Sequence, residues 1–148
     1  MRKHGPLVLF CVVVACLVSF AGKEESLEEL IARADAAHAE QQPDLYMQIA
    51  DRLLKSAGEA YKSNQWPKFR SALDDIVKYS DSAHAAAMHS NKHVKRTEIK
   101  IRQISMRLRD IKLNVGADDQ ERVQAAIDRL EGFRTELLHS LFGSRSND

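Results

Sequence analysis

The sequence has few of the residues that interrupt helices and few that cross-link chains. Its 148 residues include six glycines, three prolines and two cysteines. Both cysteines, Cys11 and Cys16, lie in the apolar N-terminal segment, so a chain cut after Ala21 has neither a disulfide nor a thiolate nucleophile. So few glycines and prolines disfavour a β architecture with many tight turns. A hydrophobic fraction of 44% with 29% charged residues is typical of a folded chain and too apolar for a disordered one.

One long stretch, between Pro67 and Gly116, has no proline and no glycine. Positions taken alternately four and three residues apart in it are apolar at eleven of fourteen places and small hydroxyl residues at the other three. They are Phe69, Leu73, Ile76, Ser80, Ala83, Ala87, Ser90, Val94, Thr97, Ile101, Ile104, Leu108, Ile111 and Val115. This unbroken heptad pattern predicts one helix over about 66–115, roughly 70 Å long. Ser90-Asn91 is its most plausible break.

Three shorter helices are predicted around the long one. Ser26-Leu27-Glu28-Glu29 reads as a capping box and starts a helix over 26–41, which ends before Pro43. A second helix covers 44–63, and a last one runs from about 119 to 142, with an aspartate as its cap. The predicted fold is therefore all-α, an elongated four-helix bundle built on the long helix.

The N-terminus has the features of a secretory signal peptide. Arg2, Lys3 and His4 form a basic region, and a short apolar run follows. Ser19-Phe20-Ala21 then offers small residues for cleavage before Gly22. The apolar run is shorter than the stretch of about 20 residues that spans a membrane comfortably.

We therefore expect a signal peptide over 1–21, a single helical domain over 22–142 and a disordered tail over 143–148. The protein is then exported, to the periplasm or the cell envelope. A lipoprotein signal is an alternative, because Val13-Val14-Ala15-Cys16 resembles a relaxed lipobox with Cys16 as the lipidated residue. An uncleaved membrane anchor is the remaining possibility.

Two parts of the sequence resemble known groups of proteins. Pro43-Asp44-Leu45-Tyr46 with the following helix, and Ala126-Ile127-Asp128-Arg129-Leu130 with Phe133, resemble a group of uncharacterised exported bacterial helical proteins. The segment 53–83 resembles a single tetratricopeptide-type hairpin, without the repeat of about 34 residues that an array requires. These resemblances imply export and a helical fold, and they bring no known activity.

His89 and His93 are candidate metal ligands, because residues four apart on one helix can bind the same ion. Met88 and His84 lie about one turn away, a mixture that suits copper better than calcium. No glutamate completes a His-Glu-x-x-His motif. The simpler interpretation is a pair of polar surface residues, so no cofactor is predicted and metal binding is kept as an alternative.

Charge is distributed unevenly along the chain. Residues 23–62 carry five basic and nine acidic side chains, whereas residues 91–113 carry eight basic and two acidic ones. The eight basic residues are Lys92, Lys95, Arg96, Lys100, Arg102, Arg107, Arg109 and Lys112. They could attract anionic envelope lipids or polysaccharide, but no aromatic side chain lies among them, so nucleic acid is an unfavoured partner. The simpler interpretation is that they meet acidic helices of the same fold or of a partner.

The sequence predicts a non-catalytic protein. Asp74-Asp75 and Asp118-Asp119 are adjacent pairs, which point in different directions on a helix, and there is no phosphate loop or nucleophile elbow. We expect an exported interaction or adaptor protein that acts through helix–helix contacts. The alternatives are a binder of polyanions or membrane surfaces through the basic segment 92–112, and a periplasmic metal binder.

The second half of the predicted long helix has only the last helix to cover it. A two-helix arm leaves part of each apolar stripe in water, and exposed apolar area favours association. We therefore expect residues 92–142 to bind a protein partner, or a second copy in a twofold four-helix bundle.

Overall fold

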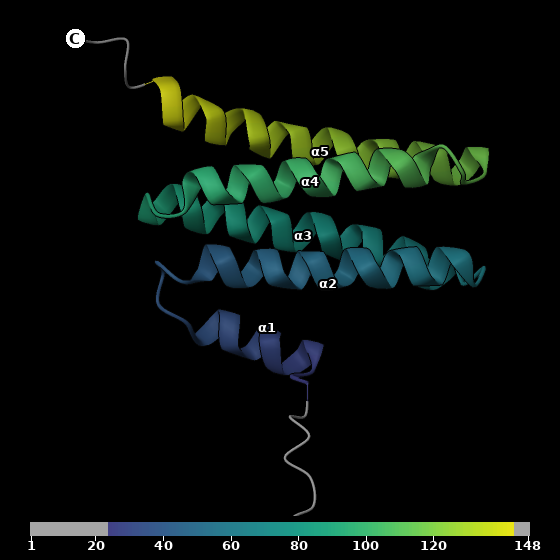
Figure 1. Ribbon diagram of the computed structural model, residues 1–148, viewed down its shortest axis with the longest axis horizontal. Coiled ribbons are helices and arrows are strands. Elements are labelled where there is room, and N and C mark those ends of the chain that lie inside the picture. Colours follow the sequence, from purple (N-terminus) through teal and green to yellow (C-terminus); the bar gives the residue numbers. More distant parts are fainter. Residues whose placement is uncertain (1–23, 144–148) are drawn as a thin grey trace, which may run out of the picture.

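The computed structural model describes residues 24–143, which form five helices and contain no strand. The helices are α1 (Leu27–Ala36), α2 (Gln42–Lys62), α3 (Trp66–Ser90), α4 (Val94–Lys112) and α5 (Ala117–Phe142) (Figure 1). The all-α helical bundle that the sequence predicts is confirmed. The signal peptide predicted over 1–21, lipid attachment at Cys16, and the predicted tail apart from Gly143 lie outside the described residues.

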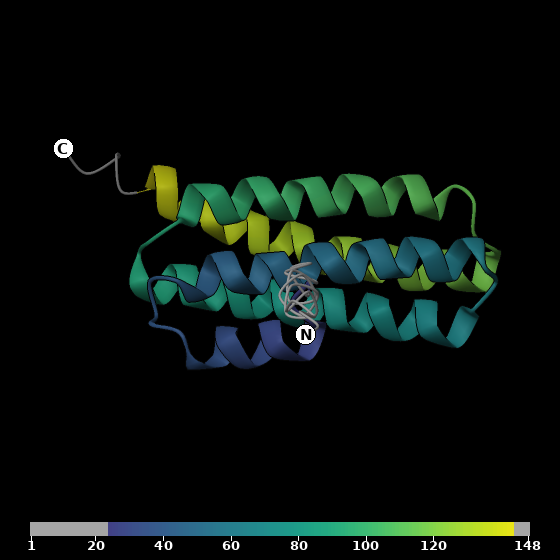
Figure 2. The same cartoon turned by 60° about the horizontal axis from the view of Figure 1, so that its bottom comes forward.

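Helices α2 to α5 run side by side in alternating directions and form a four-helix bundle (Figures 1 and 2). The most extensive contacts are within two hairpins, α2 with α3 and α4 with α5. Helix α1 packs against α2 from outside this bundle. Residues 24–143 therefore form one helix more than predicted, and their four-helix core is built without a second copy.

The predicted continuous helix over 66–115 is wrong, because α3 ends at Ser90 and α4 begins at Val94. Asn91 and His93 have φ angles of 51° and 59°, and these left-handed residues reverse the chain. Asparagine adopts this conformation more readily than most side chains. Reversal lets both halves of the apolar stripe face one shared core, where α3 packs mainly against α2 and α4 mainly against α5, which a single extended helix could not do.

The heptad positions nevertheless lie in the core. Of the fourteen positions from Phe69 to Val115, twelve are buried, and Ser90 and Ile111 are partly buried. The connection of three residues, 91–93, falls within the four-and-three spacing and leaves its phase unchanged on both sides. The pattern thus identifies the buried residues correctly but does not show where a helix ends.

The helix boundaries differ from the prediction mainly at turns. The capping box is confirmed: the Glu29 backbone N–H donates to Ser26 Oγ at 3.1 Å, and the Ser26 backbone N–H donates to Glu29 Oε2 at 2.9 Å. Helix α1 ends at Ala36 rather than at 41, and a turned connection leads to α2. Helix α5 begins at Ala117 with Gly116 as its N-cap, because Asp119 bonds to another helix instead of capping its own.

We expect Asn91→Val to lower the free energy of unfolding by about 1–2 kcal/mol, because a β-branched side chain is strained at positive φ. Urea denaturation followed by circular dichroism measures this change. The matched control is Gln103→Val at an exposed position inside α4, where the backbone is helical. If position 91 were helical, Asn91→Val would cost little, because valine and asparagine have similar helix propensities. Equal, small effects of the two substitutions would therefore contradict the turn.

Candidate interaction surface on α4

Four of the eight basic residues predicted as a polyanion site are held by polar side chains of the same fold. The pairs are Arg96 with Asp44 at 2.6 Å, Lys100 with Asp51 at 3.0 Å, Arg109 with Glu131 at 3.0 Å and Lys112 with Gln124 at 2.6 Å. Two of these partners belong to α2 and two to α5. The interpretation that these charges meet acidic groups of the same fold is therefore confirmed for Arg96, Lys100 and Arg109, whereas Lys112 meets a neutral glutamine.

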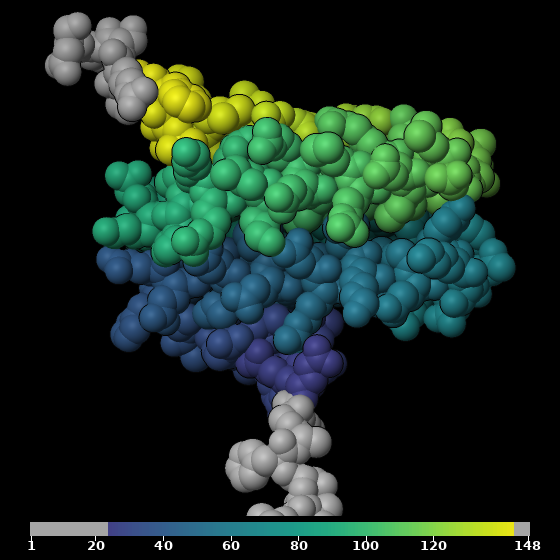
Figure 3. All heavy atoms as spheres, viewed as in Figure 1, coloured from purple at the N-terminus to yellow at the C-terminus, as the bar shows by residue number. Residues whose placement is uncertain are grey.

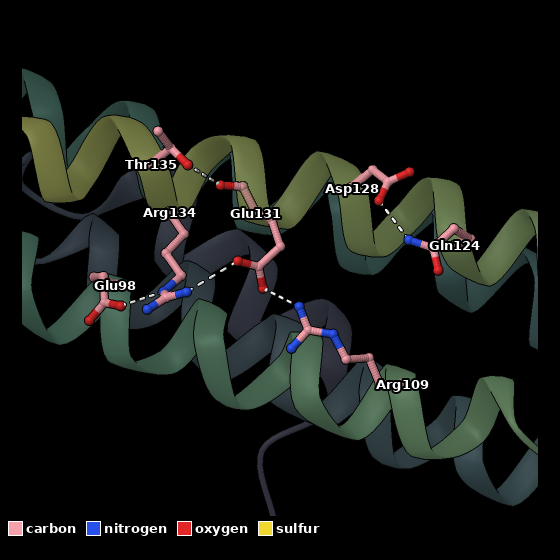
Figure 4. A network of polar contacts seen from close by, with 7 residues as sticks. All are labelled: Glu98, Arg109, Gln124, Asp128, Glu131, Arg134 and Thr135. Carbon is pink, nitrogen blue, oxygen red and sulfur yellow. Dashed lines mark hydrogen bonds and ion pairs between the residues drawn. The ribbon is translucent and has the colours of Figure 1, made fainter.

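The contacts between α4 and α5 include a continuous ion-pair network (Figure 4). Arg134 donates from Nε to Glu98 at 2.6 Å and from Nη1 to Glu131 at 3.2 Å, and Arg109 donates to the other oxygen of Glu131 at 3.0 Å. Glu98 is only 7% exposed, and its hydrogen bond raises the pKa of Arg134. This network fixes how α4 is rotated against α5, and hence which side chains of α4 face outward.

A second set of contacts holds α5 against α3. Arg70 donates from Nε to Asp119 Oδ1 at 2.7 Å, and this hydrogen bond holds the pKa of the Asp119 carboxyl below its usual range. The His84 ring stacks on Phe133 at 5.2 Å. Its Nε2 lies 3.0 Å from a Glu136 oxygen, but without the geometry of a hydrogen bond. These contacts join α5 of one hairpin to α3 of the other.

The other four basic residues, Lys92, Lys95, Arg102 and Arg107, are exposed and have no side-chain partner among residues 24–143. Two of them belong to a line along α4 in which cationic and apolar side chains alternate. We call this line the α4 stripe; it consists of Lys95, Ile99, Arg102, Met106, Arg109 and Leu113, spaced four and three residues apart. The side chains of α4 form a band across one face of the molecule, between α5 and α2 (Figure 3).

The apolar members of the α4 stripe are unusually accessible for their size. Met106 is 55% exposed and Leu113 is 81% exposed, whereas Ile99 is partly buried. By contrast, Ile127 on α5, which the two-helix arm would have left in water, is 2% exposed. The arm over 92–142 does not exist as a separate unit, because α2 and α3 cover it. The apolar surface left on α4 is therefore narrow and lies along its outer side.

The two candidate metal ligands do not share a helix face. His89 lies in the last turn of α3, and His93 lies in the turn before α4, with Nδ1 3.5 Å from Asp44 Oδ2. Within residues 24–143, no three His, Cys, Asp or Glu side chains are grouped so that they could hold a metal ion. The i, i+4 relation on which the metal prediction rested is therefore wrong, because the helix ends between the two residues.

None of the helices in the described part of the chain is long and apolar enough to cross a membrane. The chain matches no protein-family model, and comparisons with curated proteins and with solved structures found no match. The resemblance to exported bacterial helical proteins and to a tetratricopeptide-type hairpin therefore stays a prediction. The proposed function therefore rests on the exposed side chains of the fold.

Proposed function

We propose that this is a non-catalytic interaction protein whose α4 stripe binds one amphipathic helix of a partner protein. The observation that carries the proposal is the exposed alternation of cationic and apolar side chains at heptad spacing. Such spacing places side chains on one line of a helix, which is the geometry by which two helices pack. The resemblance of residues 1–21 to a signal peptide supports action in the periplasm or envelope.

The charges on the α4 stripe favour an acidic partner helix. Lys95 and Arg102 have no side-chain partner within the described chain, and opposite charges beside an apolar line set orientation and discriminate between partners. A second copy bound through the same stripe would bring cations together, which is unfavourable. We therefore propose acidic side chains beside the apolar line of the partner, in place of a twofold homodimer through 92–142.

The rigidity of α4 supports the same proposal. The Glu98–Arg134–Glu131–Arg109 network holds the helix against α5 before any partner arrives. A surface that is already ordered loses less conformational entropy when it binds. Covering Met106 and Leu113 removes apolar area from water at about 25 cal/mol per Å².

The proposal predicts binding of a designed probe, a synthetic amphipathic helix with leucine at heptad positions a and d and glutamate at e and g. Isothermal titration should show binding that weakens as salt rises, because the ion pairs are screened. We expect Met106→Asp and Leu113→Asp each to lower affinity about tenfold or more, which corresponds to about 1.4 kcal/mol. Met88→Asp is the matched control, since Met88 is 40% exposed but belongs to α3.

Three results would contradict this function. The first is equal binding of a probe with lysine at e and g, which would leave the charges of the α4 stripe without a role. The second is an equal loss of binding in Met88→Asp. The third is a stable dimer in light scattering that Met106→Asp dissociates, which would identify a second copy as the occupant.

A further inference from the structure

The fold gathers histidine at one end of the bundle. Five of the six histidines of the chain belong to the described residues. They are His38 between α1 and α2, His84 and His89 near the end of α3, His93 in the turn to α4, and His139 in the last turn of α5. The connections 37–41 and 91–93 and the end of α5 all lie at the left end of the bundle in Figures 1 and 2, with 91–93 between the other two. We call segments 37–41, 88–96 and 139–142 the histidine end.

The histidine end also carries unpaired cations and exposed apolar side chains. Lys92 and Lys95 are exposed and have no side-chain partner within residues 24–143. Met88 is 40% exposed and Phe142 is 60% exposed, and they are two of the four large apolar side chains that are exposed in the described chain. Cationic and apolar groups therefore occur together at this end, and Met88 and Phe142 come from α3 and α5 respectively.

The acidic groups near these histidines come from α1, α2, α5 and the connection 37–41. His93 and Arg96 both contact Asp44, at 3.5 Å and 2.6 Å. His38 and His93 line an open groove of about 660 Å³ together with Asp44 and Arg33, and Arg33 is paired with Glu25 at 2.9 Å. The other carboxylates at this end are Asp35 and Glu40, which are exposed, and Glu136, which lies beside His84 and three residues before His139. Gly143, just beyond α5, adjoins His139, and His89 lies three residues before Lys92.

Histidine side chains become positively charged as the pH falls from about 8 to 5. The four histidines of the histidine end, His38, His89, His93 and His139, outnumber the carboxylates there that are not already shared with a cation, because Asp44 is bound by Arg96. We propose that the histidine end binds a membrane surface with anionic headgroups, and binds it more tightly in mild acid. Headgroup anions meet the cations, while Met88 and Phe142 enter the apolar boundary beneath them.

A membrane fits these groups better than a soluble polyanion, because a soluble polyanion would not remove the exposed Met88 and Phe142 side chains from water. End-on attachment also leaves the part of the α4 stripe from Ile99 to Leu113, which lies along the side of the bundle, open to a partner helix. Lys95 belongs to both surfaces, and mutations at their other residues separate the two functions. The membrane proposal goes beyond the partner-helix function and does not depend on it.

Co-sedimentation of the full chain with lipid vesicles tests the proposal. Vesicles of phosphatidylcholine with phosphatidylglycerol should bind the protein about tenfold more tightly at about pH 5.5 than at about pH 7.5, and pure phosphatidylcholine vesicles should bind weakly at both. The quadruple variant His38→Gln, His89→Gln, His93→Gln and His139→Gln should bind equally at both pH values. Phe142→Asp should lower binding at both, whereas Leu113→Asp, the matched control on the α4 stripe, should not.

Circular dichroism establishes that each variant is folded, and Lys92→Gln with Lys95→Gln gives a second test if the histidine variant is not. These lysine substitutions should weaken vesicle binding at both pH values. Unchanged acid dependence in the folded histidine variant would overturn the proposal, as would equal binding to pure phosphatidylcholine. Binding of soluble polyphosphate with full affinity by Phe142→Asp would instead identify a polymer site and also overturn it. Met106→Asp should lose the peptide probe and keep the vesicles, which separates failure here from failure of the proposed function.

Discussion

Replacing Phe69 with alanine should lower the free energy of unfolding by about 3–5 kcal/mol, the usual cost of a large cavity in a core. Phe69 is 0% exposed in the first turn of α3. Its ring lies 6.1 Å from that of Trp66 and 6.2 Å from that of Tyr61, where the α2–α3 turn closes one end of the bundle. Deleting the ring removes buried apolar area and takes one aromatic contact from each of Trp66 and Tyr61, which still contact each other at 6.0 Å.

Urea denaturation followed by circular dichroism measures this loss, and thermal unfolding should show a fall of about 10–20 °C in Tm. The control is Phe142→Ala, which makes the same chemical change at a position that is 60% exposed. That substitution should change stability by about 0.5 kcal/mol or less, as is usual at a surface. Similar costs at the two positions would mean that Phe69 is not a core residue.

Removing three buried hydroxyl groups should make the protein more stable. Ser80 and Ser105 are 0% exposed and Thr97 is 1% exposed, and none of the three hydroxyl oxygens has a hydrogen-bond partner within residues 24–143. A buried polar group without a partner costs about 1–3 kcal/mol, and an apolar group of the same shape removes that cost. The triple variant Ser80→Ala, Thr97→Val and Ser105→Ala should therefore gain about 2–3 kcal/mol.

The control for this prediction is a serine whose hydroxyl is used. Ser90 Oγ donates to the Ala86 carbonyl at 2.7 Å and accepts from the Lys92 backbone N–H at 3.3 Å. Ser90→Ala should therefore lower the free energy of unfolding by about 1 kcal/mol. The same urea titrations compare the two variants, and a triple variant less stable than the parent chain would contradict the prediction.

The sequence by itself determined the helical class, the capping box and the identity of the buried seam. These features depend on neighbours three or four residues apart, so local chemistry and periodicity specify them. Ser26 and Glu29 cap α1 as their spacing predicts. The positions from Phe69 to Val115 are buried or partly buried because a heptad line marks one face of a helix whether or not that helix is continuous.

The turn at 91–93 was decided by tertiary structure. Ser90-Asn91 is the most plausible break in the sequence, but Asn91 and His93 adopt positive φ without being glycine and their connection keeps the heptad phase, so the heptad pattern does not show that the helix ends there. The advantage of turning comes from packing α4 against α2, α3 and α5 through contacts between residues that are distant in the sequence. The sequence thus shows that both halves of the stripe must be buried but not which helices cover them.

Tertiary structure also decided which side chains form the proposed functional surfaces. The sequence shows an excess of basic residues over 91–113, and its spacing contains the α4 stripe. Only the fold determines that Arg96 is neutralised by Asp44 on α2 and Arg109 by Glu131 on α5, while Lys95 and Arg102 remain without a partner in the described chain. The histidine end likewise joins three separate segments, 37–41, 88–96 and 139–142. Composition fixes how much charge a chain carries, but helix packing decides which charges meet each other and which are left for a partner.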